Sequence, residues 1–199
     1  MLRFVQNDSF SEVREHIREA ARKITRKNYS QEPAYVTALL ARLIGSFRLK
    51  VNGIEREITF IPTVVNDRGR NSAESITGAD FSIVFNDTDE RVNKAILGQA
   101  KNGDVSDLTD NELIMLGEQC EKMNSFTNHW IVLEAPEKSG SMPMIRIGNN
   151  DGTIRQTLKL DDYIVDYVIA CLHGDHDLEF VENVQDSALK KLIIEMRDL

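Results

Sequence analysis

The sequence predicts an α/β protein in which helices flank a central mixed β-sheet, with additional helices at both ends of the chain. Three observations support this fold class. Segments with helical and with strand periodicity follow one another in the order α-α-β-β-β-α-β. The 199 residues are 41% hydrophobic and 28% charged, as in ordinary globular proteins. No Pro/Gly/Ser-rich linker or internal repeat divides the chain, so we expect a single domain over residues 1–199.

Two helices are expected at the N-terminal end. Ser9-Phe10-Ser11-Glu12 fits the capping-box pattern, and apolar residues follow it at helical spacing up to about Lys27. Ser30 is the expected N-cap of the second helix, whose apolar stripe runs from Val36 to Phe47. Glu32 lies at the edge of that stripe, where burial disfavours a charge unless a partner neutralises it. A metal ion would be such a partner, and the alternative is an exposed acid favoured by the helix dipole.

The charge distribution restricts the classes of nucleic-acid partner. The formal net charge is −8, which argues against a protein that coats nucleic acid without discrimination, because such binding depends on phosphate neutralisation. Residues 1–27 nevertheless carry seven basic and four acidic side chains. The first helix is therefore either a phosphate-facing surface or a solvated helix with ion pairs between neighbouring turns.

The middle of the chain is expected to form strands and a helix. Glu57–Val65 alternates and is rich in β-branched residues, which predicts a strand. The apolar runs Phe81–Phe85 and Ala95–Lys101 flank the polar segment Asn86–Asn93, so we expect them to pair as antiparallel strands. Thr109-Asp110-Asn111-Glu112 is a capping box that opens a helix through Met123.

The C-terminal third is expected to begin with strands and to end in helices. Trp130–Glu134 is a compact apolar strand, and Met144–Ile147 is a short further one. A helix is expected from Asp161 or Asp162 through Leu172. A last helix is expected to begin at Asp186 or Ser187, because apolar residues follow at helical spacing.

The paired runs carry an acid, an amide and an ammonium group. Asp80 ends Thr77-Gly78-Ala79-Asp80 and opens the first run, while Gln99-Ala100-Lys101 ends the second. Strand side chains alternate with period two, so Gln99 and Lys101 share one face and could converge with Asp80. The alternative is that Asp80 pairs locally and that Lys101 is a surface residue closing a strand. The loop Asn66–Ala73 contains Arg68 and Arg70, which could hold phosphate.

These segments and the element order resemble the PD-(D/E)xK superfamily of restriction-endonuclease-like nucleases. The resemblance covers about residues 31–134, with helical additions at 1–28 and 160–199. The Gln-x-Lys form is similar to that of Mrr-like restriction endonucleases and of bacterial anti-phage effector nucleases. The resemblance implies a restriction-endonuclease-like core and an activity that hydrolyses phosphodiester bonds.

The resemblance implies a role for each matching residue. Asp80 would be the central metal ligand, and Lys101 would orient the attacking water and stabilise the transition-state charge. The Gln99 amide oxygen and the Ala100 carbonyl oxygen would complete a set of oxygen ligands for Mg²⁺, with Mn²⁺ as a substitute. Because Gln99 is uncharged, metal affinity must depend more strongly on Asp80 and on Glu32 or Glu74 as further ligands.

Two positions on the helix after the hairpin are also candidates. Gln119 matches the glutamine of the Gln-x-x-x-Tyr helix in RecB-type members, although Met123 stands where their tyrosine would be. Lys122 is a candidate nucleic-acid contact together with Arg68 and Arg70.

The expected function is Mg²⁺-dependent endonucleolytic hydrolysis of DNA in restriction or anti-phage defence. A dimer or higher homo-oligomer is expected, with a defence-system protein as a further partner. Two alternatives remain open: a non-catalytic assembly or DNA-binding protein on a nuclease-like scaffold, and a ribonuclease that uses the same site. Residues 1–8 lack an apolar signal core, and no run approaches the ~20 apolar residues of a membrane helix, so a cytoplasmic protein without membrane attachment is expected.

The cysteines predict no disulfide framework. Cys120 and Cys171 are too few and too far apart in sequence, and two buried thiols are expected. Cys171-Leu172-His173-Gly174-Asp175-His176 contains residue types that ligate zinc. No second ligand pair accompanies them, and the alternative is a polar helix terminus.

Overall fold

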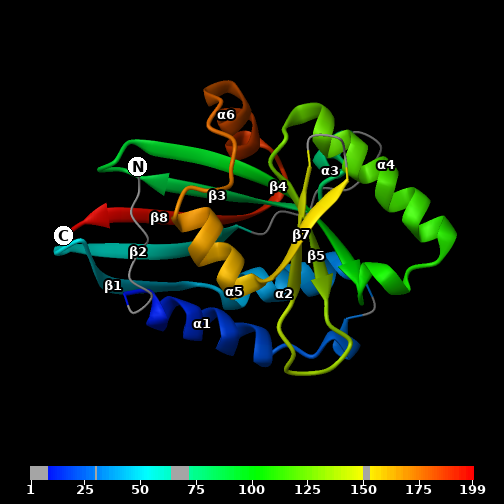
Figure 1. The fold of residues 1–199 in the computed structure, drawn as a ribbon, viewed down its shortest axis with the longest axis horizontal. Helices are drawn as coiled ribbons and strands as arrows, with labels where there is room; N and C mark the ends of the chain where they lie inside the picture. Colours follow the sequence, from blue (N-terminus) through cyan, green and yellow to red (C-terminus); the bar gives the residue numbers. More distant parts are fainter. Residues whose placement is uncertain (1–8, 30, 64–71, 150–152) are drawn as a thin grey trace.

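An eight-stranded mixed β-sheet with helices on its faces organises the computed structural model, which describes residues 9–29, 31–63, 72–149 and 153–199 (Figure 1). The predicted α/β class with a central mixed sheet flanked by helices is therefore confirmed. The strands are β1 Gly45–Val51, β2 Ile54–Thr63, β3 Phe81–Asp87, β4 Val92–Asn102, β5 Trp130–Ala135, β6 Met144–Gly148, β7 Ile154–Lys159 and β8 Lys190–Asp198. Their order in the sheet is β1-β2-β8-β3-β4-β5-β6-β7. Only the β8/β3 and β4/β5 pairs are parallel.

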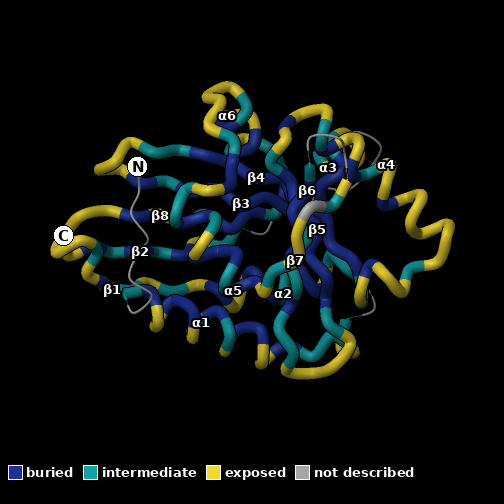
Figure 2. The backbone as a smooth tube through the Cα atoms, viewed as in Figure 1, coloured by how far each residue is buried: buried dark blue, intermediate teal, exposed yellow. Residues whose placement is uncertain are grey.

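The helices bury two hydrophobic clusters against the sheet. The helices are α1 Ser11–Arg22, α2 Glu32–Arg42, α3 Ala73–Thr77, α4 Asp110–Phe126, α5 Leu160–Tyr163 and α6 Leu178–Asp186. Short 3₁₀ turns cover Arg26–Asn28 (η1) and Val105–Asp107 (η2), and α5 continues into a π-helical segment, η3, at Ile164–Ile169. The larger cluster joins α1, α2, α5 and η3 to the sheet, and the smaller one joins α4 and α6 to it. Figure 2 shows that the buried residues are concentrated in the strands of the sheet.

The predicted hairpin and the helix that follows it are confirmed. Strands β3 and β4 pair antiparallel from Phe81↔Gly98 to Asp87↔Val92. Gly98 is required there, because a Cβ atom at this position would lie 2.4 Å from the Phe81 ring. Helix α4 begins with the expected capping box, in which the Thr109 hydroxyl accepts from the Glu112 amide and the Glu112 carboxylate accepts from the Thr109 amide at 2.8 Å.

The N-terminal helices differ from the prediction. Helix α1 has Phe10 as its N-cap and no side-chain cap hydrogen bond, so the expected capping box at Ser9 is wrong. Helix α2 ends at Arg42, and Phe47 lies in β1 rather than on a helix. Asn52 and Gly53 both have positive φ values and join β1 to β2 as a two-residue hairpin turn. The Asn52-Gly53 pair is a sequence signal for this turn. The helical spacing of the apolar residues from Val36 to Phe47 favoured a longer helix instead. The expected cap Ser30 lies outside the described residues.

The predicted last helix is wrong, because residues 190–198 form strand β8. Helix α6 ends at Asp186, where the helix was expected to begin. Strand β8 is inserted between β2 and β3, antiparallel to the first and parallel to the second. Its backbone therefore finds hydrogen-bonding partners on both sides, while Leu192, Ile194 and Met196 enter the larger cluster. The sheet thus extends beyond the expected core of residues 31–134.

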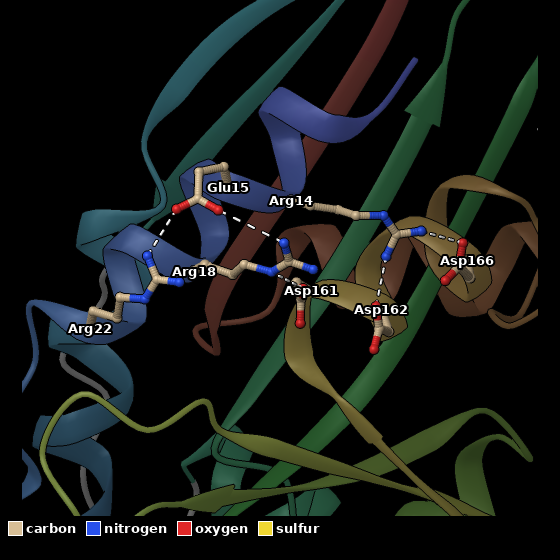
Figure 3. A network of polar contacts seen from close by, with 7 residues as sticks. All are labelled: Arg14, Glu15, Arg18, Arg22, Asp161, Asp162 and Asp166. Carbon is tan, nitrogen blue, oxygen red and sulfur yellow. Dashed lines mark hydrogen bonds and ion pairs between the residues drawn. The ribbon is translucent and has the colours of Figure 1, made fainter. Parts of the chain in front are cut away.

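An ion-pair network fastens α1 to α5 and η3 (Figure 3). Arg14 donates to Asp162 at 2.9 Å and to Asp166 at 2.5 Å. Arg18 donates to the fully buried Asp161 at 2.6 Å. These two arginines are already paired with carboxylates, so α1 does not present them as free phosphate ligands. The local pairs expected for a solvated helix are present as well, with Glu15 bridging Arg18 and Arg22.

The helices of the described residues include none with the length and apolar character needed to cross a bilayer. The longest of them, α4, has 17 residues and carries acidic side chains in its first turn.

Candidate functional site

The candidate site lies where α3 leads into the β3–β4 hairpin. Helix α3 ends at Thr77 and is capped by Gly78, whose φ of +75° is left-handed. A side chain at Gly78 would also clash with α4, because its Cβ atom would lie 2.6 Å from the Gln119 carbonyl oxygen. The tight turn carries the chain to Asp80, whose amide donates to the Gly98 carbonyl at 2.8 Å. The hairpin register thus places Asp80 beside Gln99.

Asp80 is held by the strand that carries the Gln-x-Lys segment. Its Oδ2 atom accepts from the Gln99 side-chain amide at 2.7 Å and from the Ala100 backbone amide at 2.9 Å. The same Gln99 Nε2 atom lies 3.3 Å from the Ala100 carbonyl oxygen. The structure therefore brings together the acid, the amide and the carbonyl that the sequence singled out.

Both side chains of this contact are buried. Asp80 is 4% exposed and Gln99 is 1% exposed. The Gln99 Oε1 atom is buried and has no hydrogen-bond partner among the described residues. A buried carbonyl oxygen that accepts no hydrogen bond lowers the stability of the folded state, so Gln99 Oε1 is the unsatisfied polar atom of this contact.

Burial also changes the acidity of Asp80. It raises the pKa of Asp80 to about 7, and the Ala100 amide opposes the shift by stabilising the carboxylate. The negative charges of Glu74 and Glu32 raise the pKa further, while the positive charge of Lys101 lowers it. Near pH 7 both the protonated and the ionised form of Asp80 are therefore populated.

Lys101 and Glu32 meet at the end of β4. The Lys101 Nζ atom lies 4.0 Å from Glu32 Oε2, and Glu32 Oε1 accepts from the Asn102 amide at 3.2 Å. Lys101 is 8% exposed, so it is not the surface residue of the alternative interpretation. The first turn of α2 thus delivers Glu32 to the end of β4.

The remaining predicted site residues make no hydrogen bond or ion pair with Asp80 or Gln99 among the described residues. Glu74 is exposed on α3 and acts on Asp80 through its charge. Gln119 is half-buried on α4, and its Oε1 atom is buried without a partner within the described part of the chain. Lys122 is exposed on the same helix. Arg68 and Arg70 lie outside the described residues.

Sequence reasoning missed a second buried acid beside the site. Glu134 on β5 is the register partner of Lys101 on β4. Its Oε1 atom accepts from the Val105 amide and from Arg146 Nε, both at 2.6 Å. Its charge is therefore compensated by Arg146, which makes it a support for η2 rather than a free ligand. An acid at the end of an otherwise apolar strand was the available signal.

The donor set suits a hard cation only in part. Among residues 9–29, 31–63, 72–149 and 153–199, no group of three or more His, Cys, Asp or Glu side chains is arranged to hold a metal ion. This also leaves the zinc interpretation of the Cys171–His176 segment without support. What this end of the hairpin offers is the buried carboxylate of Asp80 and the unpartnered amide oxygen of Gln99. Both are hard oxygen donors of the kind that Mg²⁺ prefers.

Comparisons with protein-family models, with curated proteins and with solved structures each found no match. The geometry of the β3–β4 hairpin is therefore the basis for a functional interpretation.

Proposed function

We propose that the protein is a Mg²⁺-dependent endodeoxyribonuclease with a restriction-endonuclease-like core, acting in restriction or anti-phage defence in the cytoplasm. The observation that carries this proposal is the contact between Asp80 and the Gln99-Ala100 segment, with Lys101 and Glu32 at the same strand end. An acid and a Gln-x-Lys segment on paired strands constitute the half-motifs that the sequence resemblance requires.

The order of elements around the hairpin supports the same proposal. Helix α2 precedes the hairpin, α4 follows it, and α4 leads into β5, which pairs parallel to β4. This matches a core of a helix, three strands, a helix and a strand when β2, β3 and β4 are the three strands. Strand β8 is a departure, because it separates β2 from β3 in the sheet.

The residues present fit a single Mg²⁺ or Mn²⁺ ion only in part, because the Gln99 amide nitrogen faces Asp80 Oδ2 and the Ala100 carbonyl. With the Gln99 amide turned over, Asp80 and the Gln99 amide oxygen would hold the ion, with the Ala100 carbonyl and Glu32 or Glu74 as additional donors. When bound, the ion polarises the scissile phosphate and makes a bound water more acidic. Ionised Asp80 supplies a buried negative charge. Lys101 stabilises negative charge that develops on the phosphate, because its ammonium is held in a site largely closed to solvent.

The acidic character of the protein favours a regulated enzyme. A formal net charge of −8 disfavours the approach of DNA to an isolated protomer. Assembly into a homo-oligomer, or association with a defence-system protein, would then complete the DNA-binding surface. A dimer suits the cutting of both strands of a duplex, which commonly requires two sites.

Plasmid cleavage tests the proposal. Wild-type protein should convert supercoiled plasmid to nicked and linear forms with Mg²⁺ or Mn²⁺, and EDTA should prevent this. Asp80→Ala should be inactive, whereas Glu90→Ala should retain wild-type activity, because Glu90 is exposed in the turn at the opposite end of the same hairpin. An Asp80→Ala variant as active as the wild type would disprove the assignment.

One observation favours a second candidate, a non-catalytic assembly or DNA-binding protein on the same scaffold. Among the described residues, Asp80 is not part of a set of three metal-ligating His, Cys, Asp or Glu side chains. DNA binding without metal-dependent cleavage, over a range of salt and metal concentrations, would support this candidate. Cleavage of RNA but not of DNA in parallel reactions would identify a ribonuclease.

A further inference from the structure

Positive charge is concentrated in two segments, although the chain as a whole is acidic. Residues 22–29, which include the end of α1 and η1, contain four basic side chains and no acidic one. The loop between β5 and β6, residues 136–143, adds Lys138 and Glu137. The whole chain carries 24 Lys and Arg against 32 Asp and Glu. These two segments therefore run against the general balance of charge.

The two segments form one surface. The Thr25 and Ser139 hydroxyl oxygens lie 3.0 Å apart, in a hydrogen bond that joins the start of η1 to the β5–β6 loop. In Figure 1 this loop lies beside the blue segment between α1 and α2. Lys138 is next to Ser139 in the chain, and its carbonyl accepts from the Ser141 amide at 3.2 Å. We call the cations that this contact brings together the η1 patch: Lys23, Arg26, Lys27 and Lys138.

Two members of the η1 patch are available to bind an anion. Lys27 and Lys138 are exposed, and neither forms an ion pair with another described residue. The acidic neighbour of Lys138 is Glu137, which is exposed as well. By contrast, Arg14 and Arg18 of α1 are paired with aspartates of α5. The end of α1 and η1 therefore offer positive charge that the middle of α1 does not.

The other two members of the patch are only weakly engaged. Arg26 donates from Nη1 to the Tyr29 carbonyl at 3.2 Å, and its buried Nε atom has no partner in residues 9–29, 31–63, 72–149 and 153–199. The Lys23 Nζ atom lies 3.4 Å from Glu19, in a pair whose side chains are both more than half exposed. Exposed pairs of this kind contribute about 0.5 kcal/mol, so a phosphate can replace the carboxylate.

The η1 patch borders the proposed active site. The segment η1 precedes α2 in the chain, and Glu32, the first residue of α2, lies 4.0 Å from the Lys101 Nζ atom through its Oε2 atom. On the other side of the patch, the Gly103 amide donates to the Ala135 carbonyl at 2.8 Å, so the β5–β6 loop begins beside the end of β4. A Cβ atom at Gly103 would lie 3.9 Å from Glu137 Cγ. Both segments of the patch therefore adjoin the strand end that carries Lys101.

We propose that the η1 patch binds the phosphate backbone of DNA and positions the duplex at the strand end that carries Lys101. This inference rests on the proposed nuclease function, which makes DNA the polyanion. Lysine and arginine side chains neutralise phosphates and release their counterions, so such binding depends strongly on salt. These contacts fix the register and orientation of a duplex without reading its sequence. The patch explains how a chain with a net charge of −8 can accept DNA on one surface.

Fluorescence anisotropy with a labelled DNA duplex tests the patch, in EDTA so that no strand is cut. A triple variant with Lys23→Gln, Lys27→Gln and Lys138→Gln removes three positive charges from exposed side chains. It should bind about 10-fold or more weakly than the wild type at about 50 mM salt. The slope of log K against log salt should be less steep by about 3, because each phosphate contact contributes about 0.9. Arg26 is left unchanged, because it also holds the Tyr29 carbonyl.

A second triple variant is the matched control, because it removes the same charge elsewhere. Arg48→Gln, Lys50→Gln and Arg91→Gln change exposed residues in β1 and in the β3–β4 turn. This variant has the same net charge as the first one, and it should bind DNA with the affinity and salt dependence of the wild type. Equal losses in the two variants would show that only the overall charge matters, and they would overturn the proposal.

The result for the patch can be separated from the result for the nuclease. Metal-dependent cleavage by the wild type, together with unchanged DNA binding by the first triple variant, would overturn the patch and leave Asp80 in its proposed role. Patch-dependent DNA binding without cleavage in any metal would support the patch and argue against the nuclease function. Binding of an RNA duplex but not of the DNA duplex would overturn the assignment of DNA as the ligand.

Discussion

Replacing Asp80 with Asn should abolish metal-dependent cleavage and yet stabilise the fold at alkaline pH. Asn has nearly the same shape, and its carbonyl oxygen can still accept from the Ala100 amide, which lies 2.9 Å from Asp80 Oδ2. It removes a charge that burial disfavours in the native state. The cost of this charge is visible in the pKa of Asp80, which is raised to about 7.

The magnitude follows from proton linkage. A carboxyl group with a pKa of about 3.9 in the unfolded chain and about 7 in the folded chain keeps its proton only in the folded state between those pH values. The free energy of unfolding of the wild type therefore falls as pH rises through this window, by about 4 kcal/mol at most. The contribution is fully present below about pH 4 and is lost above about pH 7.

Urea unfolding in the absence of divalent cations measures the effect. The difference in unfolding free energy between Asp80→Asn and wild type should grow in favour of the variant between about pH 4.5 and about pH 8. Glu90→Gln, an exposed change in the turn of the same hairpin, should show no such trend. Adding Mg²⁺ should then stabilise the wild type but not Asp80→Asn, because only the wild type binds the ion. A difference that stays constant with pH would refute the reasoning.

Three further predictions concern the site and the α1 network. Lys101→Met should reduce plasmid cleavage by about 100-fold or more while the circular dichroism spectrum is unchanged, and activity within a few-fold of wild type would exclude a transition-state role. Gln99→Glu should lower the Mg²⁺ concentration for half-maximal cleavage by about 10-fold, since it adds an anionic ligand; an unchanged metal titration would contradict this. Arg18→Ala should lower the unfolding free energy by about 3 kcal/mol, because it leaves the buried Asp161 carboxylate without its cation. The exposed pair of Arg22 makes Arg22→Ala the matched control, with an expected loss of about 0.5 kcal/mol in urea unfolding, and equal losses would argue against the burial effect.

The predictions that hold depend on short-range signals. The capping box at Thr109 sets the start of α4, and the alternation of β3 and β4 sets which residues share a face. These patterns were sufficient to place Asp80 beside Gln99 and Ala100. They could not show that the Gln99 amide donates to Asp80, or that burial raises the pKa of Asp80, because both depend on how closely the strands and α4 pack.

The sequence by itself determined the α/β class, the β3–β4 hairpin and the residue types that meet at its end, because periodicity, caps and turns act within a few residues. Only the tertiary structure decided the place of β8, whose apolar pattern fits a helix as well as a strand. The free backbone edges of β2 and β3 selected the strand. The pairing of Arg18 with Asp161 was decided in the same way. A buried charge takes whichever partner the fold brings to it, and that partner is far away in the chain.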